Sequence, residues 1–391
     1  MKPIAITGYS VMNALGDTRE AVAAALREGR SGLSPVRFPL PFQTDTGAID
    51  TVLPELPASL ADWETRTAKI SQHLLAQMRP ELEALMERWD PSRVAILLGT
   101  STAGADKTEV AYQHFVKHGA LPEDYELWKH HTYGATLHVV RELTGATGPA
   151  WMISTACTSS AKPLGSAARL IEAGIIDAAI VGGVDTLCSM TLQGFHALSA
   201  LSTERTKPFS KDRRGINIGE GGAFILLERE GPAKAWLMGV GESSDAYHLA
   251  APHPEGAGAA LAMQRALEQA NIDPAAVDFI NAHGTGTGLN DAAESKAIAE
   301  IFPPQTPVFS TKGFTGHTLG GAGATEVVFC LLSLEGGWIP PSLYAAPLDE
   351  SLAVRVTMAA EEGAYQYALS NSFAFGGNNI SVLLRAGGDH A

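Results

Sequence analysis

Cysteine is scarce in this chain of 391 residues, which contains only Cys157, Cys188 and Cys330. Three widely separated cysteines cannot form the disulfide framework of a small secreted protein. None of them belongs to a Cys-x-x-Cys pair, which argues against a thiolate zinc site. The expected location is therefore a reducing compartment, the cytoplasm.

Positive charge is also in short supply. The chain has 28 Lys and Arg against 42 Asp and Glu, so its formal net charge is −14. Such a chain has no broad basic face to replace phosphate counterions, which excludes a general nucleic-acid-binding protein. Hydrophobic residues make up 45% and glycine contributes 40 residues. This composition excludes disorder and predicts a well-buried globular protein with many tight turns.

Long apolar runs are missing as well. The N-terminal run is interrupted at residues 7–10, so no signal-peptide core is expected there. The best apolar stretch, 327–332, is far shorter than the roughly 18 residues that cross a bilayer. We therefore expect no membrane partner. A chain of this length favours two packed domains or one large duplicated domain.

Short runs rich in Val and Ile alternate with longer Ala-rich stretches, which is typical of an α/β protein with sheets covered on both faces. The expected strands are 3–7, 93–98, 151–154, 178–181, 223–227, 279–282, 308–310 and 381–384. The expected helices are 18–28 (capped by Asp17), 61–89 (broken or restarted at Pro80), 160–172, 257–270, 291–301 and 322–334.

Similar turns recur in the same order in the two halves of the chain. The Gly/Ser/Thr-rich segments 99–104 and 284–288 each follow an expected strand, and 154–157 and 310–313 each end one. Turns of this composition are common, but their matched order indicates a duplication. We predict two halves, residues 1–230 with the Cys157 motif and residues 231–391 with the histidine motifs.

Cys157 lies between an expected strand and an Ala-rich helix. A cysteine at a helix N-terminus faces unpaired backbone N–H groups and the positive end of the helix dipole, which favour thiolate. The same N–H groups can stabilise the oxyanion that forms when a thioester is attacked. Taken alone, Cys157 is better interpreted as a small buried apolar residue, the commonest role of a free cysteine. Cys188 and Cys330 lack this setting and are expected to be packing residues.

His283 and His317 are the histidines that lie in glycine-rich segments, NAHGTGTG and KGFTGHTLGGAG. Glycines let a ligand approach the backbone closely. No third histidine or carboxylate stands beside them at ligand spacing, so we expect no metal. Together with a cysteine at a helix start, two such histidines favour a catalytic site over structural roles.

Two further segments complete the candidate site. Lys312 lies in an apolar segment and needs a partner if it is buried, for which Glu326 is suitable; the alternative is a solvated lysine and glutamate. The segment 371–379, NSFAFGGNN, can bring backbone N–H groups to a substrate, while Phe373 and Phe375 line an apolar tunnel or belong to the core. No Gly-Lys-Ser/Thr phosphate loop and no Gly-x-Ser-x-Gly elbow occurs.

Together these segments resemble the β-ketoacyl-acyl carrier protein synthases, condensing enzymes of the thiolase superfamily. The resemblance covers nearly the whole chain. The Cys-His-His set is similar to that of the elongating branch, because the initiating branch has Asn in place of His317. The motifs that carry the resemblance are TACTSS around Cys157, GGVDTLC (182–188), NAHGTGTGLND (281–291), KGFTGHTLGGAGATE (312–326) and NSFAFGGNN (371–379).

The resemblance implies a thiolase-like α/β fold, with duplicated halves in five α-β-α-β-α layers, and a dimer. It implies that Cys157 accepts an acyl chain, and that His283 and His317 bind the malonyl thioester and promote its decarboxylation. Lys312, paired with Glu326, would set the electrostatics of the histidines.

The remaining roles implied by the family concern substrate contacts. The N–H groups of Cys157 and Phe375 would form the oxyanion hole, and Phe373 and Phe375 the gate. Thr285 and Thr287 would hydrogen-bond the phosphopantetheine arm of the carrier protein. No cofactor is implied beyond this arm, which belongs to the substrate.

The implied reaction is the decarboxylative Claisen condensation of an acyl-Cys157 thioester with malonyl-acyl carrier protein, which adds two carbons to a fatty-acid, polyketide or aryl-polyene chain. The partners are acyl carrier protein and a second subunit, in a homodimer or in a heterodimer with a related ketosynthase or chain-length factor. The short chain and the 252–256 stretch are more similar to aryl-polyene synthases. The alternatives are a non-catalytic chain-length partner and a coenzyme A-dependent thiolase.

Two departures from the family pattern stand near the site. Ala374 replaces the usual glycine beside Phe375, and residues 160–163 are less apolar than usual. The carrier protein is itself acidic, so docking needs a local basic patch that overcomes the overall repulsion. We expect Arg66 and Lys69 to supply it. A second candidate cluster consists of Arg205, Lys207, Lys211, Arg213 and Arg214.

Overall fold

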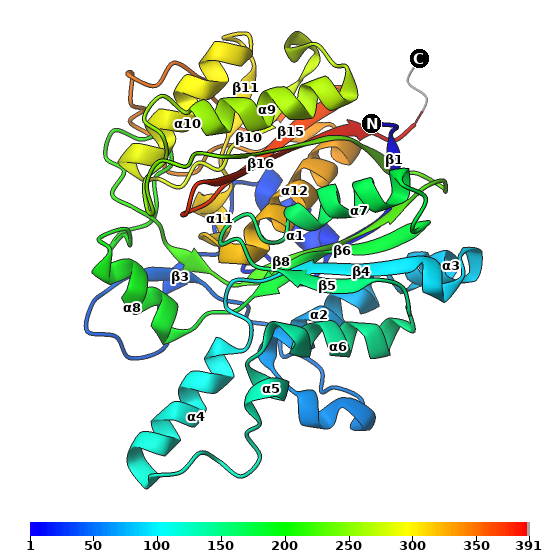
Figure 1. Cartoon of the computed structure of the whole chain (residues 1–391). Helices are drawn as coiled ribbons and strands as arrows, with labels where there is room; N and C mark the ends of the chain where they lie inside the picture. Colours follow the sequence, from blue (N-terminus) through cyan, green and yellow to red (C-terminus); the bar gives the residue numbers. More distant parts are fainter. Residues whose placement is uncertain (389–391) are drawn as a thin grey trace.

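Two layers of β-strands enclose a central layer of helices, and further helices cover both outer faces (Figure 1). The computed structural model describes residues 1–388. The first β-layer contains β1 (Ile4–Asn13), β4 (Val94–Gly99), β5 (Ala150–Ile153), β6 (Ala178–Asp185) and β8 (Gly221–Glu228). The second contains β9 (Ala235–Ser244), β10 (Phe279–Asn281), β11 (Pro307–Phe309), β13 (Arg355–Val356), β15 (Tyr367–Phe373) and β16 (Asn378–Ala386).

The strand order of the first layer recurs in the second. The first runs β5-β4-β6-β8-β1, and the second runs β11-β10-β15-β16-β9 with β13 added beyond β11. Directions also match, because the two pairings at the β5 or β11 end are parallel and the next two are antiparallel. The expected duplicated fold is therefore confirmed. At one edge β1 pairs with β9 through Ile4–Ile6, which joins the two layers into one sheet.

The helices divide among the three α-layers according to which faces they bury. The central layer contains α1 (Arg19–Arg27), α7 (Lys162–Glu172) and α12 (Ala322–Gly336). One outer face is covered by α2 (Arg66–Gln77), α3 (Arg79–Arg88) and α6 (Tyr133–Thr144), and the other by α9 (Ala257–Ala270) and α10 (Gly288–Ile301). The expected five α-β-α-β-α layers are thus present (Figure 1).

The remaining elements lie around this frame. Helices α4 (Ala105–His118) and α5 (Leu127–His130) extend away from the layers, and α8 (Ser189–Ala197) lies beside them (Figure 1). The short helix α11 (Lys312–Thr315) lies between β11 and α12. The short strands are β2 (Ser34–Pro35), β3 (Asp45–Gly47) and β7 (Ile218–Gly219), which form a three-stranded sheet, and the pair β12 (Trp338–Ile339) and β14 (Glu361–Glu362).

Helix α12 is the most apolar element and occupies the middle of the molecule. Its residues from Ala322 to Leu334 are all buried, because both β-layers and α1 pack around it. Together with the preceding turn it forms a segment, Leu319–Gly336, that has the length and hydropathy of a membrane span, but 89% of this window is buried in the protein core. The apolar run 327–332 that stands out in the sequence is only part of this longer buried segment. A helix that is apolar on all sides is expected where every side is covered.

Several element boundaries differ from the sequence-based expectations. Thr18 caps α1, accepting a hydrogen bond from Ala21 N at 3.2 Å, in place of Asp17. The expected helix 61–89 is a 3₁₀ turn (Ala58–Trp63) followed by α2 and α3, and Pro80 lies in the first turn of α3 as a restart requires. Strand β1 continues past Thr7, because a register shift around Gly8 lets it follow β8 to Asn13.

Candidate active site

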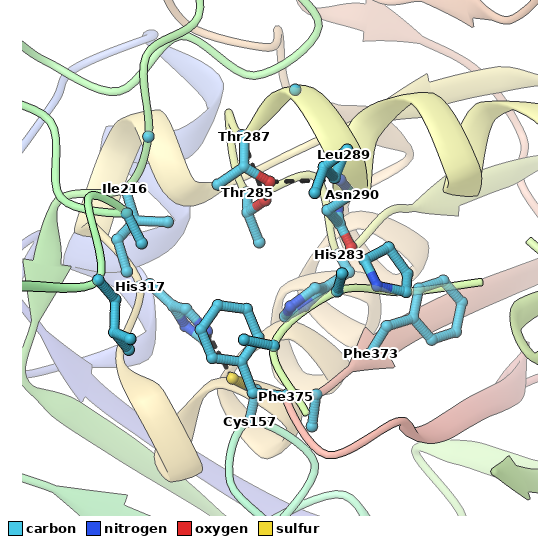
Figure 2. Close-up of a pocket in the computed structure, with 18 of the residues that line it drawn as sticks. Cys157, Ile216, His283, Thr285, Thr287, Leu289, Asn290, His317, Phe373 and Phe375 are labelled. Carbon is cyan, nitrogen blue, oxygen red and sulfur yellow. Dashed lines mark hydrogen bonds between the residues drawn. The ribbon is translucent and has the colours of Figure 1, made fainter. Parts of the chain in front are cut away.

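The loops that follow β5, β10 and β11 converge on one cavity of about 420 Å³ (Figure 2). Cys157 comes from the first half of the chain, and His283 and His317 come from the second. All three side chains line the cavity and are buried. The duplication therefore places the nucleophile and the histidines opposite one another across the junction of the halves.

Cys157 lies in a tight turn between β5 and α7. The residue before it, Ala156, has a φ of 50°, and the carbonyls of Thr155 and Ala156 accept hydrogen bonds from the N–H groups three residues on. Strand β4 supports this turn at close range, because a Cβ on Gly99 would lie 2.0 Å from the carbonyl oxygen of Ser159. Helix α7 begins at Lys162, two residues later than expected, so Cys157 precedes the helix by a full turn.

The thiol of Cys157 rests protonated. Burial raises its pKa to about 11, although the charge of Lys312 and a backbone hydrogen bond from Phe375 favour the thiolate. The backbone N–H groups favour the thiolate as expected, but the cost of desolvating the anion outweighs them. The Nε2 atom of His317 lies 2.9 Å from Sγ and is in position to accept the proton (Figure 2).

Both histidines are neutral. Burial, followed by the charge of Lys312, holds the pKa of His317 well below its usual value. The same two causes lower the pKa of His283, with a further contribution from His317. The two rings lie edge to face, with centroids 5.3 Å apart. A neutral imidazole has one N–H donor and one lone pair, so each ring can donate to a carbonyl oxygen without carrying a charge.

Lys312 determines which nitrogen of His283 carries the proton. Its ammonium donates to Glu326 Oε1 at 2.6 Å and to the carbonyl of His283 at 2.5 Å, and it lies 3.4 Å from His283 Nδ1. Three N–H groups thus meet three acceptors. Because Nδ1 accepts, the ring proton of His283 belongs on Nε2, the nitrogen away from Lys312. The predicted Lys312–Glu326 pair is present, and both side chains are almost fully buried.

The ligand atoms of Cys157, His283 and His317 lie within 4.8 Å of one another, which is a possible metal-binding arrangement. The sequence places no third ligand beside the histidines, whereas the fold brings Cys157 next to them. A divalent ion would nevertheless compete with the Lys312 ammonium next to His283 and with the proton on Nε2. This set of residues therefore suits a metal poorly.

Two carboxylates of α10 that the sequence analysis missed hold the His283 loop. Glu294 accepts the backbone N–H groups of His283 and Gly284, both at 2.8 Å. Asp291 accepts the N–H groups of Gly286 and Phe209 at 3.2 and 2.9 Å. Burial raises the pKa of Glu294 to about 7. The available signal was their spacing, because acidic residues three apart on a helix share the face toward the preceding loop.

The segment 373–377 closes one side of the cavity. The side chain of Phe375 is 37% exposed at the mouth, and its ring centroid lies 5.9 Å from that of Phe195 on α8. Phe373 is buried with its ring centroid 6.2 Å from that of His283. Gly376 and Gly377 follow with φ values of 85° and 77°. An aromatic ring at the mouth, followed by two glycines, has the composition of a gate.

Thr285 and Thr287 lie across the cavity from Cys157 (Figure 2). Their hydroxyls are 2.9 Å apart, and Thr287 also caps α10 by accepting from Asn290 N. They can offer hydrogen bonds to a polar chain that enters from the mouth. Lys162, one of the residues that make the 160–163 segment less apolar than usual, points away from the cavity. Its ammonium donates to Glu242 of β9 at 2.9 Å.

The basic residues expected to dock a carrier protein are already paired. Arg66 makes a two-pronged contact with the buried Glu220, and the ammonium of Lys69 lies between Glu55 and Glu64. In the second cluster, Arg205, Lys207 and Arg213 also have carboxylate partners. Within residues 1–388, Lys211 and Arg214 make no ion pair, and Arg214 lines the cavity mouth.

Both halves of the chain match known protein families. Residues 1–233 match the model of the β-ketoacyl synthase N-terminal domain, and residues 234–345 match that of the C-terminal domain. This chain belongs to the β-ketoacyl synthase family. It is 30% identical over 98% of both chains to 3-oxoacyl-[acyl-carrier-protein] synthase 2 of Vibrio cholerae, and 31% identical, with the same coverage, to that of Vibrio harveyi.

Solved structures of ketosynthases share its fold. One is the ketosynthase ApeO in complex with its chain length factor ApeC from Xenorhabdus doucetiae, with a TM-score of 0.94, 39% identity and 98% coverage of both chains. Another is the ishigamide ketosynthase/chain length factor, with a TM-score of 0.91, 28% identity and 99% coverage of both. The expected family, thiolase-like fold and enzyme class are confirmed. The chain is a β-ketoacyl-acyl carrier protein synthase, an acyltransferase that catalyses condensation.

The protonated thiol generates a prediction for the pH dependence of alkylation. Iodoacetamide reacts with the thiolate, so the rate at Cys157 should rise with pH toward a midpoint near 11, above the value of about 8.5 for free cysteine. Peptide mass spectrometry distinguishes Cys157 from the other cysteines. Because the Lys312 charge lowers this pKa, Lys312→Met should move the midpoint higher still. A wild-type midpoint at or below 8.5 would contradict the resting state described above.

Proposed function

We propose that the synthase condenses an acyl-Cys157 thioester with malonyl-acyl carrier protein and so extends the acyl chain by two carbons. The observation that carries this proposal is the 2.9 Å contact between Cys157 Sγ and His317 Nε2, with His283 in the same cavity. A thioester exchange needs a soft nucleophile that is also a good leaving group, which favours cysteine. Neutral histidines provide donors for a developing enolate without an added charge.

The first step loads the acyl chain. Cys157 Sγ attacks the thioester carbonyl of the acyl carrier protein, and the thiol proton passes to His317 Nε2. The oxyanion is stabilised by the N–H groups of Cys157 and Phe375, both of which favour negative charge on the sulfur. The C–S bond to the carrier then breaks, and the departing carrier sulfur takes the proton. His317 returns to its neutral form.

The second step forms the carbon–carbon bond. The acylated sulfur has no proton to donate to His317, so the neutral ring of His317 shifts its proton from Nδ1 to Nε2 by exchange with solvent. The malonyl thioester carbonyl accepts hydrogen bonds from the Nε2–H groups of His283 and His317, and the bond to the carboxylate breaks, releasing carbon dioxide and leaving its electron pair in the enolate. The enolate carbon attacks the acyl carbon on Cys157. The C–S bond breaks and the sulfur takes up one proton from solvent. Thr285 and Thr287 hold the pantetheine arm during this step.

The two alternatives have less support. A non-catalytic chain-length partner has no need of the nucleophile, yet Cys157, both histidines and Lys312 are assembled with hydrogen-bonding geometry. A coenzyme A-dependent thiolase uses a second catalytic cysteine. Cys188 and Cys330 are buried but do not line the cavity, and Cys330 lies inside α12.

Substitutions in the triad test these roles. A radiolabelled acyl-carrier thioester should label the wild-type protein at Cys157 and leave Cys157→Ala unlabelled. His283→Ala should slow malonyl-carrier decarboxylation about 10²–10³-fold, the cost of removing one donor to a developing oxyanion. Cys188→Ala serves as the control and should keep both activities. An unlabelled wild-type protein, or a His283→Ala variant with normal decarboxylation, would refute the assigned roles.

We further propose that the acyl product belongs to the aryl-polyene class. Support comes from the 252–256 stretch, which resembles that of aryl-polyene synthases, and from the identity to the ketosynthase ApeO, 39%, against 30% and 31% to the two 3-oxoacyl-[acyl-carrier-protein] synthases. The cavity wall is also apolar at Phe195, Leu198 and Phe373, which suits a flat conjugated chain.

Product analysis tests the pathway. Purified protein should extend an aromatic or conjugated acyl-carrier primer at least tenfold faster than a saturated primer of equal length, measured by mass spectrometry of the carrier-bound products. Equal rates with both primers, or a preference for the saturated one, would assign the protein to ordinary fatty-acid elongation instead.

We propose that Arg214, with Lys211, receives the acidic carrier protein at the cavity mouth. Both side chains are exposed and make no ion pair within the described chain, so their charge is available to a partner. Arg66 and Lys69, in contrast, are committed to carboxylates of this chain. In a protein with a net charge of −14, such local charges determine where an acidic partner approaches.

Paired arginine substitutions separate docking from stability. Arg214→Ala should raise KM for the malonyl carrier about fivefold, roughly 1 kcal/mol, with unchanged kcat and melting temperature. Arg66→Ala should instead destabilise the protein by about 3 kcal/mol, because it leaves the buried carboxylate of Glu220 without its cation. The value lies at the lower end of the usual range because the side chain of Arg66 is 34% exposed. Melting curves and steady-state kinetics on both variants provide the test. A normal KM for Arg214→Ala would exclude it from docking.

We propose that the chain works as one subunit of a pair with a related chain. Strand β5 is the last strand of its layer, and Trp151 on it is 37% exposed. Nearby helices α4 and α5 present further exposed apolar side chains: Val110, Tyr112, Phe115, Val116, Leu127 and Trp128. An uncovered edge strand beside such a surface suits a partner of the same kind. The ketosynthase ApeO is itself found with a chain length factor.

Light scattering tests this pairing. The purified chain, alone or co-expressed with a related chain-length factor, should form a species of two subunits, compared with 41.1 kDa for one. Trp151→Lys should shift the population to single subunits. Pairing through β5 would remove water from the lysine ammonium, and the cost of this desolvation weakens the interface. The matched control is Leu261→Lys on α9, which is 39% exposed and should leave pairing intact. A Trp151→Lys protein that still pairs would argue for another face.

A further inference from the structure

Asp185 is a fully buried carboxylate to which the mechanism above assigns no role. It ends β6 and is 0% exposed. Within residues 1–388 no lysine, arginine or histidine lies within ion-pair distance of it, so its charge is balanced by hydrogen-bond donors. A buried charge without a cation is costly unless many donors surround it, which makes this position unusual.

The donors come from two segments that belong to different halves of the chain. From the loop after β4, Ser101 N and Thr102 N donate at 3.0 Å, Thr102 Oγ1 donates at 2.8 Å, and the hydroxyls of Thr100 and Ser101 also donate. From the loop that carries His317, Gly320 N donates to Asp185 Oδ2 at 2.6 Å. Gly320 N also lies 3.1 Å from Ser101 Oγ.

Gly320 connects this carboxylate to both reacting residues. It follows His317 by three positions, and its carbonyl accepts the N–H of Ser160 at 3.0 Å. Ser160 follows Cys157 by three positions, and its hydroxyl accepts Ala324 N at 2.9 Å. A Cβ on Gly320 would lie 2.7 Å from Asp185 Oδ2, so this approach requires glycine. The Cys157 turn and the His317 loop are thus joined through Gly320, which Asp185 holds.

We infer that Asp185 is a positioning residue that sets the contact between Cys157 and His317. A carboxylate is suited to this role because its two oxygens only accept, and every group that faces them donates. Asparagine has the same shape, but its NH₂ group would face donors and break the contacts on one oxygen. The inference rests on the proposed roles of Cys157 and His317 in acyl transfer.

The test compares Asp185→Asn with a matched control, Asp278→Asn. Asp278 also accepts two backbone N–H groups, from Gln366 and Tyr367 at 2.6 and 2.8 Å, but it lies at the other end of the C-terminal layer and touches no catalytic segment. Asp185→Asn should lower the rate of Cys157 acylation about 10²-fold, the effect of a displacement of about 1 Å. KM for the malonyl carrier should stay unchanged.

A double-mutant cycle with His317→Ala separates positioning from a general loss of stability. If Asp185 acts through the contact between Cys157 and His317, Asp185→Asn has little further effect once the His317 ring is absent. We expect Asp185→Asn to slow acylation about 10²-fold in the wild-type background and less than about threefold in His317→Ala, and Asp278→Asn to have no effect in either. Equal losses in the two backgrounds, or a normal acylation rate, would overturn the inference.

A milder variant covers the case in which Asp185→Asn does not fold. Ser101→Ala removes one hydroxyl donor and its contact with Gly320 N but keeps the backbone donors. It should slow acylation less than Asp185→Asn does, and only while His317 is present. Wild-type behaviour of a folded Ser101→Ala protein would count against the inference. Failure of the wild-type protein to be labelled at Cys157 would instead refute the proposed function itself.

Discussion

The ion pair between Lys312 and Glu326 is the interaction on which the chemistry of the cavity depends. Both side chains are almost completely buried, where an isolated charge would be very costly, so each is stable only with the other. The lysine uses its remaining N–H groups on the carbonyl and ring of His283. Burial lowers the pKa of both histidines, and this interior charge lowers it further and directs one ring proton toward the substrate.

Two loops that the duplication makes equivalent have different roles in the two halves of the chain. The loop after β4 and the loop after β10 occupy equivalent places in the repeated strand order. In the second half this loop carries His283 and the threonines that line the cavity. In the first half it supplies only hydrogen-bond donors to Asp185. One copy therefore contributes side chains to the reaction, while the other holds the backbone that presents them.

The sequence was sufficient to predict the α/β class, the duplication and the residues that meet in the cavity, because these depend on local patterns and motifs. It was insufficient for properties that arise from complete burial or from contacts between distant segments. The protonated state of Cys157 follows from desolvation that no local pattern reveals. Arg66 seemed available until the fold placed Glu220 beside it. Asp185 acts through the backbone N–H groups of Ser101 and Gly320, which lie 84 and 135 residues away in sequence.

The short pairing between β1 and β9, through Ile4–Ile6, is where the strands of the two halves meet. The reacting atoms lie on another part of the same seam, and their contact is held by hydrogen bonds through Gly320 and through Ser160, whose hydroxyl accepts Ala324 N of α12. Opening of the seam would separate the β-layers from α1, α7 and α12, whose apolar side chains form one continuous core with both layers. The distance between the reacting atoms is therefore tied to the most deeply buried layer of the molecule, and catalytic geometry and central core are expected to be lost together.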